Sequence, residues 1–100
     1  MMSHRLSQRA RADLDDIWRY IALESGSETL ADQQIEIDQL TDRFYLLATW
    51  PLIGPPRSEL RRGLRSHPVG EYIVFYRVHR RDVVIQRVLH ARRNIAALFR

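Results

Sequence analysis

The residues of this chain that could do chemistry are one histidine at the end of an apolar run and several arginines around it. His90 could act as a general acid or base, and the arginines could stabilise a phosphate group. Cleavage of RNA at a 2′-hydroxyl would require groups of this kind. The candidate phosphate ligands are Arg65, Arg77, Arg87, Arg92 and Arg93. Because a lone histidine at a strand end is more often structural, we interpret His90 as a structural or interface residue.

The other reactive side chains form no recognisable site. Asp13, Asp15 and Asp16 are so closely spaced that they are typical of a solvated helix face near the positive end of the dipole. The four histidines lack the spacing of a metal site on one element. The sequence has no cysteine, no serine in a Gly-x-Ser-x-Gly turn and no glycine-rich phosphate loop. We therefore predict no metal, no cofactor and no catalytic nucleophile.

Charge is distributed unevenly along the chain. Residues 1–50 carry 5 arginines and 9 acidic residues, whereas residues 51–100 carry 11 arginines and 3 acidic residues. The second half is thus strongly basic, which favours an acidic partner. The length of 100 residues is enough for one core, so we expect a single domain spanning residues 1–100. No stretch resembles a signal peptide or a membrane span, and we expect a cytoplasmic protein without a membrane partner.

Two amphipathic helices are predicted in the first half. One runs from Gln8 to Glu24 behind Ser7 as N-cap, and a capping box from Ser25 to Glu28 begins the other. The second helix runs to Ala48, because Trp50 precedes a proline. The apolar residues predicted to face inward are Ala10, Leu14, Ile17, Trp18 and Ile21 of the first helix, Leu30, Ile37, Leu40, Phe44 and Leu47 of the second, and Trp50.

Three apolar runs in the second half predict an antiparallel meander. A weak run from Leu60 to Leu64 comes first, a central strand from Tyr72 to Val78 follows, and its partner runs from Val83 to Leu89. The connections are residues 67–70, which contain a proline and a glycine, and residues 80–82. Residues 3–7 permit an edge strand. The aromatic residues of the central run, Tyr72, Phe75 and Tyr76, are predicted to pack in the sheet.

These elements predict an α+β fold in the order β-α-α-β-β-β, with a helical hairpin packed on an antiparallel sheet. The helices cover only one face of that sheet. Because the central strand is apolar on both faces, we expect the other face to meet a partner.

Four segments resemble a known family when taken in order from about Ala10 to Asn94. They are DLDDIWRYIA, LATWPLIGPPR, ELRRGLRSHPVGEYIVFYRV and VIQRVLHARRN, and together they resemble the ParE branch of the RelE/ParE toxin superfamily. The resemblance implies the toxin of a bacterial type II toxin–antitoxin system, which inhibits DNA gyrase by binding and has no enzymatic activity. It also implies neutralisation by a ParD-like antitoxin whose C-terminal segment wraps the toxin.

The alternative function is that of the RelE branch, which contains ribosome-dependent mRNA endonucleases. Ile73 stands where that branch is expected to have a phosphate-binding arginine, and Ala91 where an aromatic residue follows the terminal histidine. These departures favour the gyrase inhibitor. A third alternative is a basic nucleic-acid-binding module without toxicity, although we expect no sequence-specific nucleic-acid binding.

The residues predicted to bind gyrase or the antitoxin are mostly basic, and for the strand arginines a solvated surface is the alternative. The segment from Leu89 to Arg93, together with Arg65, is the predicted gyrase surface. The full set is Arg57, Arg61, Arg65, Leu89, His90, Arg92 and Arg93.

Overall fold

The computed structural model of the chain describes residues 2–25 and 30–99, apart from the side chains of residues 22, 24, 25 and 30–36. The elements are β1 (Ser3–Leu6), α1 (Gln8–Ser25), α2 (Leu30–Thr49), β2 (Arg65–Val69), β3 (Tyr72–His79), β4 (Asp82–His90) and α3 (Ile95–Leu98). The predicted order β-α-α-β-β-β is confirmed. The short helix α3 is an additional element that was not predicted from the sequence.

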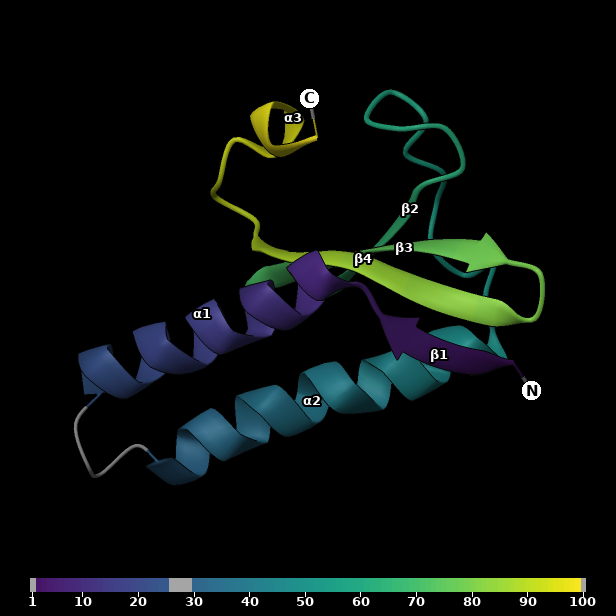
Figure 1. Cartoon of the computed structure of the whole chain (residues 1–100). Coiled ribbons are helices and arrows are strands. Elements are labelled where there is room, and N and C mark those ends of the chain that lie inside the picture. Colours follow the sequence, from purple (N-terminus) through teal and green to yellow (C-terminus); the bar gives the residue numbers. More distant parts are fainter. Residues whose placement is uncertain (1, 26–29, 100) are drawn as a thin grey trace.

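The sheet has the strand order β1-β4-β3-β2. Strands β2, β3 and β4 form the predicted antiparallel meander, whereas β1 pairs with β4 in parallel, so the sheet is mixed. Figure 1 shows α1 and α2 side by side on one face of the sheet and α3 on the opposite side. The predicted α+β architecture is therefore confirmed. None of the described helices is long and apolar enough to cross a membrane.

Helices α1 and α2 form where the apolar periodicity indicates. Helix α1 begins after Ser7, whose Oγ accepts a hydrogen bond from the Ala10 N–H at 3.0 Å, as expected of an N-cap. Helix α2 ends at Thr49, just before the Trp50-Pro51 pair that disfavours helical backbone. The predicted capping box between Ser25 and Glu28, and the side chain of Leu30, lie outside the described residues.

Strand β2 lies five residues later than predicted. The run from Leu60 to Leu64 forms turns, and the strand is Arg65–Val69, which includes Pro68. The Ser66 N–H donates to the Pro55 carbonyl, so it points to the outer edge of the sheet. Pro68 is two residues further along the strand and faces the same outer edge. An N–H at that position would not donate to β3, so the proline costs the sheet no hydrogen bond. The turn to β3 is made by Gly70, with φ of 57°, and Glu71.

The helix side of the sheet holds the larger apolar core. Phe44 and Ile17 are buried there as predicted, at 3% and 7% exposure. Trp18 and Trp50 are 41% and 62% exposed, so the prediction that they are core residues is wrong. Trp18 lies about 100° around the helix from Ile17, at the margin of the apolar stripe, and Trp50 follows the end of α2. The buried members are Ala10, Ile17, Leu40, Phe44, Leu47, Val69, Val74, Tyr76, Val83, Ile85 and Val88.

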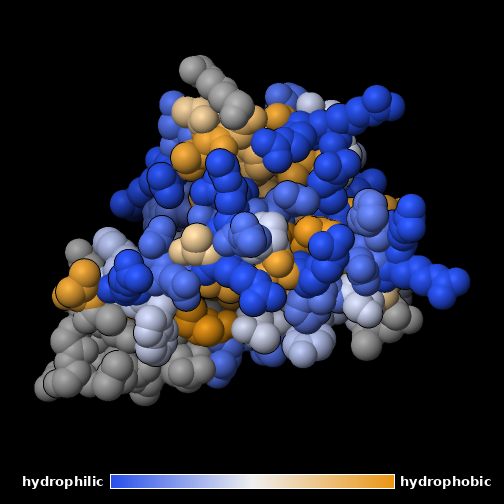
Figure 2. All heavy atoms as spheres, in the orientation of Figure 1, coloured by the Kyte–Doolittle hydropathy of each residue, from blue (hydrophilic) through white to orange (hydrophobic). Residues whose placement is uncertain are grey.

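The second face of the sheet is covered by the chain itself, which corrects the prediction that this face meets a partner. Leu64, Phe75, Leu89 and Phe99 form a second buried cluster there, and apolar residues of α3 pack against it. The Phe75 and Phe99 rings meet edge to face, with centroids 5.0 Å apart. On the side of the molecule seen in Figure 2, apolar residues reach the surface as separate patches among hydrophilic ones. The central strand is apolar on both faces because two internal layers cover it.

His67 on β2 makes stability depend on pH. Its Nε2 atom is buried and has no hydrogen-bond partner among the described residues. Burial lowers the pKa of His67, and the positive charge of Arg43 lowers it further. The folded state therefore resists a proton that the unfolded chain takes up below a pKa of about 6.5.

We expect the free energy of unfolding to be highest above pH 6.5 and to fall as the pH drops from there toward the lower pKa of the folded state. Urea unfolding at a series of pH values between 5 and 8 measures this. A His67→Gln variant should lose part of the pH dependence, and His79→Gln, at an exposed position, serves as the control. An identical pH profile in wild type and His67→Gln would contradict the assignment.

Candidate partner-binding groove

Helix α1 continues along the edge of β4 where β1 ends. Strand β1 pairs with β4 only as far as Ile85. The Ser7 N–H then donates to the Ile85 carbonyl at 2.9 Å, and Ser7 Oγ donates to the Gln86 carbonyl at 2.8 Å. Gln86 is the extra residue of a β-bulge on β4. Ser7 thus caps α1 and also fastens the first turn of that helix to the sheet.

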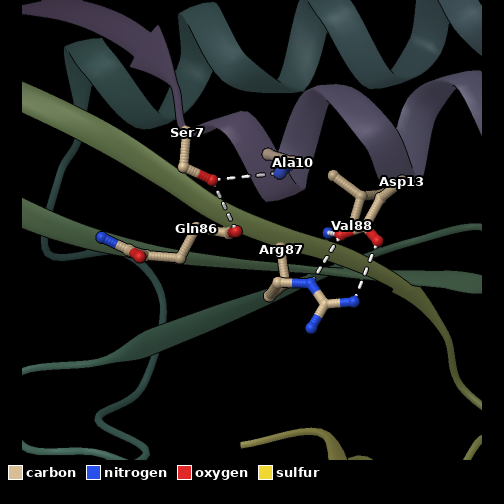
Figure 3. Close-up of polar contacts among 6 residues, drawn as sticks. All are labelled: Ser7, Ala10, Asp13, Gln86, Arg87 and Val88. Atoms are coloured by element: carbon tan, nitrogen blue, oxygen red, sulfur yellow. Dashed lines mark hydrogen bonds and ion pairs between the residues drawn. The ribbon is translucent and has the colours of Figure 1, made fainter.

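A buried ion pair joins α1 to β4 further along the same edge (Figure 3). The Asp13 carboxylate accepts hydrogen bonds from Arg87 Nε at 2.8 Å and Arg87 Nη2 at 3.0 Å. It also accepts one from the Val88 N–H at 2.9 Å, which satisfies a backbone donor at the edge of the strand. The hydrogen bonds to Asp13 raise the pKa of Arg87. With side chains only 9% and 14% exposed, the two residues form an internal link in the fold.

Asp13 therefore does not belong to a solvated acidic face, and the prediction for this residue is wrong. Asp15 and Asp16 are exposed, in agreement with it. Arg87 is also less available as a phosphate ligand than its sequence position suggested, because two of its three nitrogens bind Asp13. The two partners are 74 residues apart, so the spacing of charges within α1 carries no signal of the pair.

A groove of about 390 Å³ opens between α1 and the end of β4, beside this ion pair. Its floor consists of residues that are buried in the fold, and its rim carries exposed aromatic and charged side chains. The floor residues are Ile17, Val88 and Leu89, and the rim residues are Asp16, Tyr20, Arg92 and Arg93. Four of the seven predicted partner-binding residues therefore lie together at the groove, namely Leu89, His90, Arg92 and Arg93.

His90 organises the turn that carries the two rim arginines. Its ring packs edge to face on Tyr72, the residue paired with it across the sheet, with centroids 5.4 Å apart. His90 Nδ1 accepts a hydrogen bond from the Arg92 N–H at 3.1 Å, and the His90 carbonyl accepts one from the Arg93 N–H at 3.0 Å. Nε2 lies 3.6 Å from the Glu71 carboxylate. His90 thus holds the backbone of Arg92 through its side chain and that of Arg93 through its carbonyl, so the residue has a structural part in this turn.

The other three predicted residues are not brought to the groove, because their guanidinium groups hold parts of the fold. Arg57 lies over the Phe75 ring at 5.6 Å from its centroid and binds Glu59 at 2.6 Å. Arg61 lies over the Phe99 ring at 5.4 Å. Arg65 donates to the Gly54 carbonyl at 2.7 Å. Arg65 pairs with Tyr76, four residues along β3 from Tyr72, the partner of His90, and it does not line the groove with the residues of the 89–93 segment.

An exposed apolar loop at the end of α2 was missed by the sequence analysis. Trp50, Leu52 and Ile53 are 62%, 68% and 52% exposed. The loop is held by Tyr76, whose buried hydroxyl donates to the Pro51 carbonyl at 2.8 Å and accepts from the Gly54 N–H at 3.0 Å. A Cβ atom on Gly54 would come within 2.3 Å of the Ser66 carbonyl oxygen, so only glycine fits there. The run of apolar residues beside prolines was the available signal.

The groove is suited to holding a partner that offers an apolar side chain and carboxylates. Its buried floor can accept the apolar side chain, and the forked guanidinium groups of Arg92 and Arg93 can bind the carboxylates. Ile73, at the position of the expected nuclease arginine, packs against the second core, and Ala91 is exposed. Within residues 2–25 and 30–99, no group of three or more histidine, aspartate or glutamate side chains is placed to hold a metal ion.

Comparison with known proteins gives consistent matches over nearly the whole chain. Residues 5–95 match the family described as the ParE toxin of the type II toxin–antitoxin system parDE. Toxin ParE1 of Caulobacter vibrioides is 43% identical over 97 residues, which cover 97% of this chain and 97% of the relative. Toxin ParE3 of the same organism is 38% identical over 85 residues, covering 85% of this chain and 82% of the relative.

The fold is also found among solved structures. A chain in the chromosomal ParDE TA system from P. aeruginosa superposes with a TM-score of 0.74 at 22% sequence identity. The match covers 90% of this chain and 96% of that chain. At this level of identity the likeness concerns the arrangement of helices and strands.

Proposed function

Because the chain belongs to the ParE toxin family of type II toxin–antitoxin systems, we propose that it inhibits DNA gyrase by binding and that a cognate ParD-like antitoxin neutralises it. In this proposal the toxin acts in the cytoplasm and has no enzymatic activity. The surface that meets gyrase is the rim formed by Arg92 and Arg93. The observation that carries the proposal is that His90 holds these two exposed arginines beside a groove with an apolar floor.

The same observations favour binding over RNA cleavage. A ribonuclease needs an acid, a base and cations aimed at one phosphate. The Nδ1 atom of His90 already accepts the Arg92 N–H, and Arg87 is bound to Asp13. Ile73 contributes to the second core where the nuclease branch would place a cation.

Replacing both Arg92 and Arg93 by alanine is expected to relieve growth inhibition and to weaken inhibition of supercoiling by purified gyrase at least tenfold. Two exposed arginines at a binding surface commonly contribute more than about 1.4 kcal/mol together, which is tenfold in affinity. Stability should change by less than about 0.5 kcal/mol per residue, because both side chains are exposed.

The matched control is the double variant Arg62→Ala/Arg81→Ala, which removes the same charge at exposed positions that do not line the groove. It should inhibit gyrase as wild type does. If both double variants lose gyrase inhibition to the same extent, the inhibition depends only on the net charge of the protein, and the proposed surface is wrong. If purified protein cleaves ribosome-bound mRNA and His90→Ala abolishes the cleavage without unfolding, the nuclease function replaces the proposal.

The antitoxin is expected to be acidic and to stabilise the toxin on binding. A ligand at about 100 times its dissociation constant adds roughly 2.7 kcal/mol to the free energy of unfolding. The protein encoded beside this chain, added in that excess, should therefore raise the melting temperature and abolish gyrase inhibition. A neighbouring product that changes neither quantity would contradict this part of the proposal.

A further inference from the structure

A second cavity, of about 260 Å³, lies where the first turn of α1, strand β4 and the C-terminal segment meet. Arg87 lines this cavity, whereas its partner Asp13 lines the groove described above. The walls also carry Arg9 and Arg61, and Leu98 and Phe99 supply an apolar part. Three arginine residues from widely separated positions in the sequence thus border one small space.

The guanidinium groups of two of these arginines, Arg87 and Arg61, are held in place by the fold. Arg87 binds Asp13 through Nε and Nη2, and Figure 3 shows its remaining terminal nitrogen pointing away from Asp13. Arg61 lies over the ring of Phe99, at 5.4 Å from its centroid. Fixed donors lose little conformational freedom when they bind a ligand, which favours affinity.

The charge around the cavity is not balanced by the residues that line it. No carboxylate is present among the described residues of the lining, and Asp13, outside it, offsets only the charge of Arg87. Arg9 and Arg61 leave an excess of two positive charges. We propose that this cavity binds a phosphate group, whose two negative charges match that excess and whose oxygens suit forked guanidinium donors.

The surroundings agree with a phosphate carried on a small organic group. The space is larger than one phosphate needs, and Leu98 and Phe99 border it on one side. Ser7 and the first residues of α1 also line it, so the positive end of the helix dipole adds to the attraction of the arginines. This site is separate from the groove proposed to meet gyrase and does not depend on that function.

Titration calorimetry of the full-length protein with inorganic phosphate, ATP and a 20-base-pair DNA duplex tests the proposal, at fixed ionic strength set with chloride. We expect inorganic phosphate or ATP to bind one site, and Arg9→Gln and Arg61→Gln each to weaken binding about tenfold, since a hydrogen bond to a charged group has roughly that effect. Arg62→Gln and Arg81→Gln, which change charge at exposed positions outside both the cavity and the groove, should bind as wild type does.

The three probes separate the sources of the phosphate. Tighter binding of ATP than of inorganic phosphate, lost in both cavity variants, identifies a nucleotide or similar ester. Tighter binding of the duplex, lost in the same variants, identifies the nucleic-acid backbone. Binding that falls equally in the cavity and control variants, or no binding of any probe by folded wild-type protein, overturns the proposal. Thermal melting of each variant verifies that Arg61→Gln, which loses its contact with Phe99, is still folded.

Discussion

Replacing Asp13 by alanine should destabilise the protein by about 3 to 5 kcal/mol, because the substitution leaves Arg87 charged and unpaired inside the fold. The Val88 N–H would also lose its acceptor. For a domain of this size, a loss of that magnitude lowers the melting temperature by more than about 10 °C. Thermal and urea denaturation followed by circular dichroism measure both quantities.

Asp16→Ala is the matched control, since it removes the same charge from the exposed face of the same helix. It should change the free energy of unfolding by less than about 0.5 kcal/mol. A double variant, Asp13→Leu/Arg87→Met, should recover much of the lost stability, because apolar replacement of a buried ion pair is often neutral. An Asp13→Ala protein that melts like wild type would mean that the pair does not form.

Replacing Phe44 by alanine should cost about 3 to 5 kcal/mol, which is close to the whole stability of many domains of this size. Phe44 is 3% exposed and lies in the core between the helices and the sheet. Trp18→Ala removes a larger side chain that is 41% exposed, and it should cost less than about 1.5 kcal/mol. Chemical denaturation measures the loss in free energy of unfolding for Phe44→Ala and for Trp18→Ala. If Trp18→Ala were the more destabilising change, the orientation of α1 would have to be different.

The parts of the fold that depend on local pattern could be predicted from the sequence. Spacings of three and four placed α1 and α2, and the runs of β-branched and aromatic residues placed β3 and β4. Strand β2 could not be placed in the same way. A proline such as Pro68 interrupts any local strand pattern, and only its position on the outer edge of the sheet makes it acceptable.

The candidate binding surface could be predicted only in part, because charge patterns do not show which charges are already paired. Leu89, His90, Arg92 and Arg93 come together at the groove because they are neighbours at and just beyond the end of β4. Asp13 and Arg87 form an ion pair although they are 74 residues apart in the sequence. The contacts of Arg57, Arg61 and Arg65 are likewise with aromatic rings and carbonyl groups that only the folded chain brings near. Helix α3 had a weak signal in Asn94, whose side chain accepts from the Ala97 N–H, followed by an apolar run.

The parallel pairing of β1 with β4 sets the time at which a newly made chain can fold. Residues 3–6 pair with residues 82–85, so β1 cannot join the sheet until residues 82–85 have been synthesised. Synthesis at about 5 to 20 residues per second leaves the finished helical hairpin without its sheet for roughly two to eight seconds. Throughout that interval the apolar stripe of α1 and α2 lacks its covering layer. A chain cut short before β4 therefore lacks the strand that joins β1 to β3, and the proposed gyrase surface at Arg92 and Arg93 can form only after that strand has been made.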